Sequence, residues 1–299
     1  MQMSFSIKRT RLILFSVLLF VFVGFFACSG EKSDSVRNAA LEPRLIHDQA
    51  EMDVYLQKFP FQDYEICEVP EIGKFYLDDN PAAVKKTLRK GRPWEKYVIE
   101  EFKRYVVPGT TVLDVGAHIG SHTIPLARLV GPQGHVYAFE PQKKIFRELV
   151  YNLELNEINN VTPLRFAISS GLSIVEMDAV KGPDGQVAIG KGGDKVEART
   201  LDSFGFSNIS LIKIDVEGHQ AFVLEGAERT IREWHPVIII EITEAHKYNE
   251  LPPYKKKRID ETKRLLKAFG YYFRLIRPNR GHDYIALYEK SAQSQQMVR

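Results

Sequence analysis

The chain has 299 residues, enough for one large or two small domains with a sizeable core. Hydrophobic residues make up 44% and charged residues 26%, which excludes fibrous and disordered classes. The formal net charge is only +3 and no basic stripe alternates with aromatic residues, so nothing indicates a nucleic-acid partner. Two cysteines, Cys28 and Cys67, are too few for a disulfide framework and lack the spacing of a zinc site.

The first feature in chain order is an apolar segment that belongs outside the folded domain. Lys8, Arg9 and Arg11 precede the uncharged run Leu12–Gly30, which is close to the roughly 20 residues that a membrane-spanning helix needs. The basic flank predicts a single-pass anchor with the N-terminus in the cytoplasm and the domain on the non-cytoplasmic side. A lipoprotein anchored through Cys28 and a cleaved signal peptide are the alternatives.

A polar linker and a small N-terminal cap are expected over residues 31–104. The patterns there predict a helix near 47–59, one or two short strands around 64–77 and a helix around 94–104. The main domain is expected over 105–292, and 293–299 reads as a polar tail.

From Thr111 onward, short apolar strands alternate with amphipathic helices. Strands are expected at 111–115, 135–139, 161–168, 211–215, 236–242, 271–276 and 283–289, and helices at 121–130, 142–156, 221–234 (broken near Gly226) and 259–268. This alternation predicts an α/β fold with a parallel sheet, helices on both faces and one antiparallel strand at the end. The glycine-rich stretch 181–194 is expected to be a surface loop rather than a lid.

The turn after the first of these strands has the sequence DVGAHIG. Gly116 directly follows the strand and Gly120 opens the helix, an arrangement that lets the chain turn tightly and a ligand approach the backbone. The spacing is neither the GxGxxG of dinucleotide sites nor a phosphate loop. On its own this turn is equally consistent with close packing of a helix on a strand.

An acidic residue, Glu140, follows the next strand and precedes Pro141. A carboxylate at this position can accept hydrogen bonds from both hydroxyls of a ribose, although it would also suit the positive end of a helix dipole. The glycine turn and Glu140 together favour a nucleoside-bearing ligand without a pyrophosphate.

A third acidic motif, LIKIDVEGH, lies at the end of a later strand. Asp215 comes at the carboxyl end, where open α/β sheets hold ligands, and Glu217 and His219 follow at the start of a helix. Helix capping would need one acid, whereas two acids and an imidazole in a small volume favour a functional site. Glu241 and Glu244 follow at the same edge of the sheet.

The ordered set of motifs, which covers roughly half of the chain, resembles the FkbM family of S-adenosylmethionine-dependent methyltransferases. Its pieces are DVGAHIGSHT at 114–123, FEP at 139–141, TLDS at 200–203, IKIDVEG at 212–218, VLEGA at 223–227 and HPVIIIEI at 235–242. The resemblance implies a class I methyltransferase-like Rossmann sheet of seven strands with the last antiparallel. It also implies O-methylation of a hydroxyl on a sugar, glycan or small metabolite.

The resemblance further implies which residues hold the cofactor. The glycine turn with Asp114, Gly116 and Gly120 would hold the methionine end, and Glu140 the ribose. The remaining residues expected beside the cofactor are Ala117, His118, Pro141 and Ala167. His118 stands where members of the family often have Asn.

Asp215, Glu217 and His219 are the expected catalytic residues, facing the methyl group and the acceptor. A hydroxyl acceptor must lose a proton, and the residues that could take it are Asp215, His118, His122, His219 and His246. Gln220 stands where an acid is common in the family, so the general base stays open. No metal is expected, because no ligand cluster is visible. The competing hypothesis is a catalytically degenerate cofactor-binding module tethered at the membrane.

Overall fold

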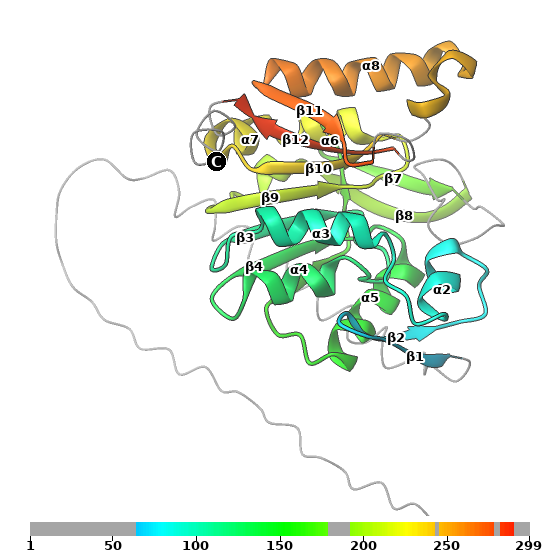
Figure 1. Ribbon diagram of the computed structural model, residues 1–299. Coiled ribbons are helices and arrows are strands. Elements are labelled where there is room, and N and C mark those ends of the chain that lie inside the picture. Colours follow the sequence, from blue (N-terminus) through cyan, green and yellow to red (C-terminus); the bar gives the residue numbers. More distant parts are fainter. Residues whose placement is uncertain (1–63, 179–191, 243–244, 278–281, 290–299) are drawn as a thin grey trace, which may run out of the picture.

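The computed structural model describes residues 64–178, 192–242, 245–277 and 282–289. A seven-stranded sheet lies at its centre (Figure 1). Its strands are β3 (Thr111–Val115), β4 (His135–Phe139), β5 (Val161–Leu164), β9 (Ile209–Ile214), β10 (Val237–Glu241), β11 (Tyr271–Leu275) and β12 (Asp283–Tyr288). All seven lie within or close to the ranges that the apolar runs predict.

The strand order is β11-β12-β10-β9-β3-β4-β5. β5, β4, β3, β9 and β10 pair in parallel, whereas β12 pairs antiparallel with both β10 and β11. The last strand of the chain is therefore the antiparallel one, which confirms the predicted Rossmann-like methyltransferase sheet. The order also places the ends of β3, β4, β9 and β10 beside one another.

Helices cover both faces of this sheet. They are α3 (Lys96–Tyr105), α4 (Thr123–Val130), α5 (Lys143–Leu155), α6 (Gln220–Glu225), α7 (Glu228–Trp234) and α8 (Pro253–Ala268). Successive side chains of a strand point to opposite faces, so Val112 packs in one core with α3, α4 and α5, and Leu113 in the other with α6, α7 and α8. The predicted break between α6 and α7 near Gly226 is confirmed.

The N-terminal cap consists of the hairpin β1 (Glu65–Val69) and β2 (Gly73–Leu77), followed by the short helix α2 (Ala83–Leu88). Figure 1 shows these elements beside α5 at one end of the sheet. The short strands expected around 64–77 are confirmed, and they pair as a hairpin. Helix α2 is not predicted, because it is too short for a clear helical period.

A buried ion network fastens the cap to α5. The ammonium of Lys85 on α2 is fully buried and lies 2.5 Å from Asp78 Oδ1 and 2.7 Å from Glu148 Oε2 on α5. Tyr64 donates to Glu148 Oε1 at 3.0 Å, and Lys144 lies 2.6 Å from Asp78 Oδ2. Lys85 thus pairs with one carboxylate of the cap and one of α5, so its buried charge is compensated across the contact between the two.

A second, three-stranded sheet is the main departure from the predicted elements. It contains β6 (Ala167–Ile168), β7 (Ser173–Asp178) and β8 (Gly192–Arg199), in the order β6-β8-β7. The single strand expected over 161–168 is wrong: the chain leaves the large sheet after Leu164 and Ala167 pairs with Ala198 of β8. Residues 192–194, expected as loop, belong to β8, and most of that expected loop lies outside the described residues.

Three further expectations from the sequence concern the start of α8 and two N-terminal segments. Helix α8 begins at Pro253, earlier than the predicted residue 259, because proline suits the first helical turn and the apolar periodicity only starts later. The expected helix at 47–59 and the expected membrane segment at 12–30 both lie outside the described residues. Within the described ranges, no helix has the length and apolar character needed to cross a bilayer.

Candidate active site

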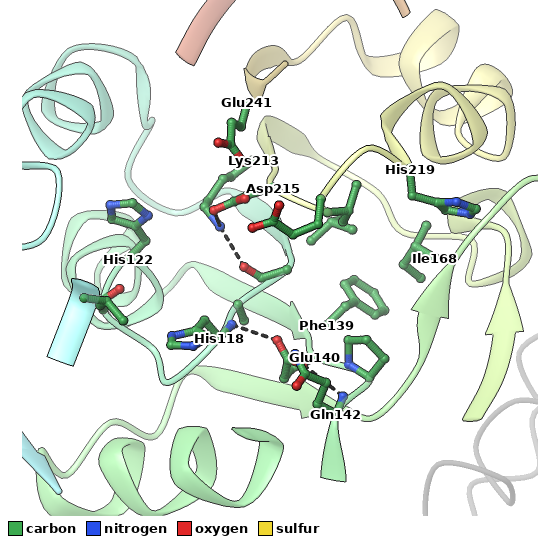
Figure 2. Close-up of a pocket in the computed structure, with 18 of the residues that line it drawn as sticks. His118, His122, Phe139, Glu140, Gln142, Ile168, Lys213, Asp215, His219 and Glu241 are labelled. Atoms are coloured by element: carbon green, nitrogen blue, oxygen red, sulfur yellow. Dashed lines mark hydrogen bonds and ion pairs between the residues drawn. The ribbon is translucent and has the colours of Figure 1, made fainter. Parts of the chain in front are cut away.

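A cavity of about 280 Å³ opens at the carboxyl ends of β3, β4, β9 and β10. Its floor is the turn after β3 and the ends of β4 and β9, and one wall comes from the cap and the start of α3. Ala167, Ile168 and Met177 of the small sheet form the opposite wall. In Figure 2, Phe139, Glu140 and Ile168 lie on one side, and His122, Lys213, Asp215 and Glu241 on the other.

The turn after β3 requires glycine at position 116. Gly116 has φ +85, and a Cβ on it would lie 1.8 Å from the backbone oxygen of Asp215. The tips of β3 and β9 therefore approach so closely that no side chain fits between them. A Cβ on Gly120 would instead meet Leu149 of α5 at 3.0 Å, so Gly120 serves helix packing.

Asp114 and Lys213 form an ion pair beneath the floor of the cavity. Asp114 is fully buried, accepts a hydrogen bond from the Thr123 hydroxyl at 2.7 Å and lies 3.1 Å from Lys213 Nζ. Lys213 also donates to the Gly116 carbonyl at 2.8 Å and lies 3.6 Å from Asp215. Burial alone would lower the pKa of Lys213, but Asp114 and Asp215 hold it above its ordinary value. This lysine is a fixed positive charge at the base of the site.

Glu140 is held by the backbone in an orientation that exposes its carboxylate to the cavity. Oε2 accepts from the His118 N–H at 3.0 Å and Oε1 from the Gln142 N–H at 2.9 Å. His118 has a positive φ of 50, which aims its amide at Glu140. Burial raises the pKa of Glu140 to about 7, although both amides oppose that shift. Each oxygen keeps a lone pair for a ligand hydroxyl.

The wall beside Glu140 is apolar. It is formed by Val115, Phe139, Pro141, Phe166, Ala167, Ile168 and Met177. Arg199 stacks over the Phe166 ring at 4.1 Å from its centroid and stiffens this wall from behind. Such an apolar surface, next to a carboxylate that can bind a ribose, suits the flat aromatic base of a nucleoside.

At the other end, three carboxyl groups converge, two from the segment after β9 and one from the end of β10. Asp215, Glu217 and Glu241 each have an oxygen within 4.8 Å of the others, close enough that they could hold a cation. Burial and the neighbouring Asp215 raise the pKa of Glu241 to about 11, so it keeps its proton and hydrogen-bonds Asp215. Burial would raise the pKa of Asp215, but Lys213 and Glu241 hold it below its ordinary value. Asp215 therefore carries the charge of the pair.

Two neutral histidines flank the cavity. His219 lies 3.0 Å from the Ser169 hydroxyl and stacks on Phe222 at 4.5 Å between ring centroids. Burial, aided by Arg258, lowers the pKa of His219 to about 4. Burial likewise lowers the pKa of His122 to about 3, helped by Lys213. Both rings are uncharged at neutral pH and act as hydrogen-bond partners.

The structure brings together most of the residues that the sequence predicts. Those that line the cavity are Gly116, Ala117, His118, Glu140, Pro141, Ala167, Asp215, Glu217 and His219. Asp114 and Gly120 are not among the lining residues, and the expected direct contact with the methionine end is corrected to a supporting role for both. Glu244 and the side chain of His246 lie outside the described residues.

Several lining residues escape the sequence reasoning. They are Trp94, Glu95, Phe139, Phe166, Met177 and His282. Lys213 is not one of them: it lies two residues before Asp215, so strand alternation predicts that both side chains point to the same side. Glu95 gives no such signal, since it precedes a helix of the cap region whose position over the sheet cannot be read from the chain.

Comparison with known protein families agrees with this fold and cavity. The Methyltransferase FkbM domain matches residues 114–273. The chain belongs to the FkbM methyltransferase family. S-adenosylmethionine is the methyl donor of this family, which confirms the predicted cofactor.

The curated relatives are more distant. Hexuronic acid methyltransferase AglP of Haloferax volcanii is 29% identical over 136 residues, which cover 42% of this chain and 53% of that protein. A tRNA(Phe) (4-demethylwyosine(37)-C(7)) aminocarboxypropyltransferase of Methanocaldococcus jannaschii is 39% identical over 74 residues, or 24% of this chain and 29% of that protein. The chain thus spans about half the length of the first relative and less than a third of the second.

Among solved structures, the methyltransferase FkbM of Methylobacillus flagellatus KT aligns with a TM-score of 0.44 and 18% identity. The alignment covers 69% of this chain and 53% of that protein.

The cavity residues fit this cofactor. The apolar wall around Phe139 and Ile168 suits the adenine ring, and Glu140, with both oxygens already oriented by backbone amides, suits the ribose diol. The cavity then continues toward Asp215 and Glu241, where the sulfonium and amino-acid part would lie among carboxylates. The bound cofactor supplies an electrophilic methyl group there.

Proposed function

We propose that the protein is an S-adenosylmethionine-dependent O-methyltransferase that acts on a hydroxyl of a sugar, a glycan or a small metabolite. The observation that carries this proposal is the carboxyl pair Asp215 and Glu241 at the end of the cavity opposite Glu140. A hydroxyl acceptor needs a group that takes its proton, and an ionised carboxylate at the site of methyl transfer supplies one. The hexuronic acid methyltransferase from Haloferax volcanii supports an acceptor of the sugar class.

The roles of the residues follow from their charges. In the proposed reaction the acceptor oxygen forms a bond to the methyl carbon, the bond from that carbon to sulfur breaks, and the hydroxyl proton passes to Asp215. Lys213 keeps Asp215 ionised before the reaction, and protonated Glu241 orients it by donating a hydrogen bond. Burial of the site excludes water, so alignment of the two reactants provides most of the acceleration.

The carboxylate hypothesis competes with His219 as the proton acceptor. His219 lines the same cavity, but its Nε2 already lies 3.0 Å from the Ser169 hydroxyl and its ring stacks on Phe222. It also lies apart from the carboxyl pair, on another side of the cavity (Figure 2). We therefore assign the role of base to Asp215. His219 forms part of the cavity wall.

The test uses the full-length protein with methyl-labelled S-adenosylmethionine and a panel of hexuronic acids, neutral sugars and glycans. Mild alkaline hydrolysis removes the label from a methyl ester. Label that survives on an acceptor whose nucleophiles are only hydroxyl and carboxyl groups, such as a hexuronic acid, is a methyl ether and therefore shows O-methylation of a hydroxyl. Asp215→Asn should lower kcat by about 10²-fold or more. The exposed Asp79→Asn serves as the matched control, with no change expected. Cofactor binding without turnover on any hydroxylated acceptor would refute the proposal and favour a non-catalytic module.

We further propose that the apolar segment 12–30 holds the domain at a membrane, with the domain on the non-cytoplasmic side. The support is the sequence pattern of basic residues followed by an uncharged run. Protease added to sealed vesicles should leave the domain intact if it lies inside the compartment. Complete digestion from the cytosolic face would overturn the orientation, and mass spectrometry of the N-terminus distinguishes a retained anchor from cleavage or lipidation at Cys28.

A further inference from the structure

The groups that the sequence predicts for the methionine end of the cofactor already lie beside a cation of the protein. Asp114 is fully buried and is not among the residues that line the cavity; one of its oxygens accepts from Thr123 and the other lies 3.1 Å from Lys213 Nζ. The Gly116 carbonyl accepts from Lys213 Nζ. The amino-acid part of S-adenosylmethionine carries a positively charged α-ammonium group. Because Lys213 already places a positive charge beside both Asp114 and the Gly116 carbonyl, acceptors farther from that charge suit a second cation better.

His122 offers one such acceptor. Its side chain is buried, lines the cavity, and has no hydrogen-bond partner for Nε2 among the described residues. The ring hydrogen-bonds the backbone of Trp94, so Nδ1 is the nitrogen that makes this bond and Nε2 keeps a free lone pair. The Phe102 ring packs edge-on at 5.4 Å between centroids and fixes the orientation of the imidazole. A buried acceptor without a partner indicates a missing ligand.

Glu95 offers the second acceptor. It precedes α3, lines the same cavity, and its side chain is 17% exposed. Its Oε2 lies 3.8 Å from His122 Nε2. The backbone of Glu95 has φ 42, in the left-handed region that residues other than glycine rarely adopt. His118 and Glu217, which line the same cavity, share this backbone feature.

The two acceptors suit an ammonium group in geometry and charge. The two acceptor atoms, Glu95 Oε2 and His122 Nε2, lie 3.8 Å apart. An ammonium nitrogen beside the line that joins them can lie about 2.8 Å from both and donate one hydrogen bond to each. The neutral imidazole does not repel a cation, and burial together with Asp283 and Asp215 raises the pKa of Glu95 to about 8, so a nearby positive charge would favour its ionised form. In Figure 2, His122 lies across the cavity from Ile168 and Phe139, the side suited to adenine.

We propose that Glu95 and His122 together bind the α-ammonium group of S-adenosylmethionine. The inference rests on the use of this cofactor but not on the proposed acceptor. It gives the N-terminal cap region a direct part in cofactor binding, through a residue that lies before the family's matched segment.

The test compares two ligands that differ in the part concerned. S-adenosylhomocysteine carries the α-ammonium group, whereas 5′-methylthioadenosine has the same nucleoside without the amino acid. Isothermal titration calorimetry on the full-length protein should show that Glu95→Gln weakens binding of the first ligand by about 10-fold or more, since charge-assisted hydrogen bonds are the strong ones. Binding of 5′-methylthioadenosine should stay within about twofold. His122→Asn, which keeps a donor near Nδ1 but removes the Nε2 acceptor, should show the same selectivity.

Glu100→Gln is the matched control, because Glu100 lies on the solvent-facing side of α3 and pairs with Lys103. It should change neither affinity. Equal losses for both ligands in Glu95→Gln would mean that Glu95 only shapes the cavity, and no loss for S-adenosylhomocysteine would overturn the inference directly. If the wild-type protein binds neither ligand, the inference fails irrespective of the acceptor.

Discussion

The close approach of β3 and β9 at Gly116 gives the sharpest prediction for a single substitution. In Gly116→Ala the new Cβ would start 1.8 Å from the Asp215 oxygen, and real contacts of this kind essentially never fall below 3.0 Å. The two strand tips must therefore separate by about 1.2 Å or more. Adding the positive φ, which costs a residue with a Cβ about 1–2 kcal/mol, to overpacking of about 1–3 kcal/mol predicts a loss of roughly 2–5 kcal/mol.

The same displacement should damage the site more than the fold. Asp215 sits on the displaced tip, and a shift of about 1 Å at reacting groups costs on the order of 10²-fold in rate. Gly109→Ala separates strain from displacement, because Gly109 also has a positive φ of 79 but open space around its Cβ position. Gly171→Ala, with neither feature, should be nearly neutral.

Urea unfolding and titration with S-adenosylhomocysteine measure the two effects separately. Gly109→Ala should lose about 1–2 kcal/mol and keep wild-type affinity. Gly116→Ala should lose more stability and at least tenfold in affinity. The reasoning would be refuted if Gly116→Ala and Gly109→Ala behaved alike in both measurements.

Three further outcomes follow from the charges of the site. Lys213→Met should destabilise the protein by about 3–5 kcal/mol in urea unfolding, because Asp114 is left buried without a cation; an unchanged midpoint would contradict this. In any Lys213→Met protein that still folds, the acidic limb of the rate profile should move to higher pH, since Asp215 loses the charge that lowers its pKa. Glu241 holds a proton in the folded state between its ordinary pKa of 4.5 and about 11, so its contribution to stability falls as pH rises through that window. The Tm of Glu241→Gln should therefore fall less than the wild-type Tm between pH 6 and pH 9. Equal decreases in the two proteins would count against a protonated Glu241.

The sheet could be predicted from the sequence because each strand is a short apolar run with its own turn signals. Val112 and Leu113 enter opposite cores, as period-two burial requires, and the helices between strands carry one apolar face each. The small sheet could not be predicted in the same way. Its β6 is only Ala167–Ile168 and pairs with β8 across a long excursion of the chain, so its register depends on contacts that are distant in sequence.

The candidate site could likewise be predicted only in part. Glu140 and Asp215 follow strands, and the topology of a parallel sheet brings strand ends together, so their proximity follows from the sequence. Which groups remain available to a ligand does not follow. That Asp114 is occupied by Lys213, and that Glu95 reaches the cavity from the cap region, are results of three-dimensional packing.

The fully buried Lys85 has a consequence for the order in which the molecule can assemble. Its partner Glu148 belongs to α5, which follows the first two strands of the large sheet, whereas Lys85 itself precedes them. A chain synthesised from its N-terminus thus produces the cap, with Lys85 and Asp78, before the helix that supplies Glu148. A fragment that stops before α5 would leave Lys85 with Asp78 alone and the hairpin without the helix surface on which it rests.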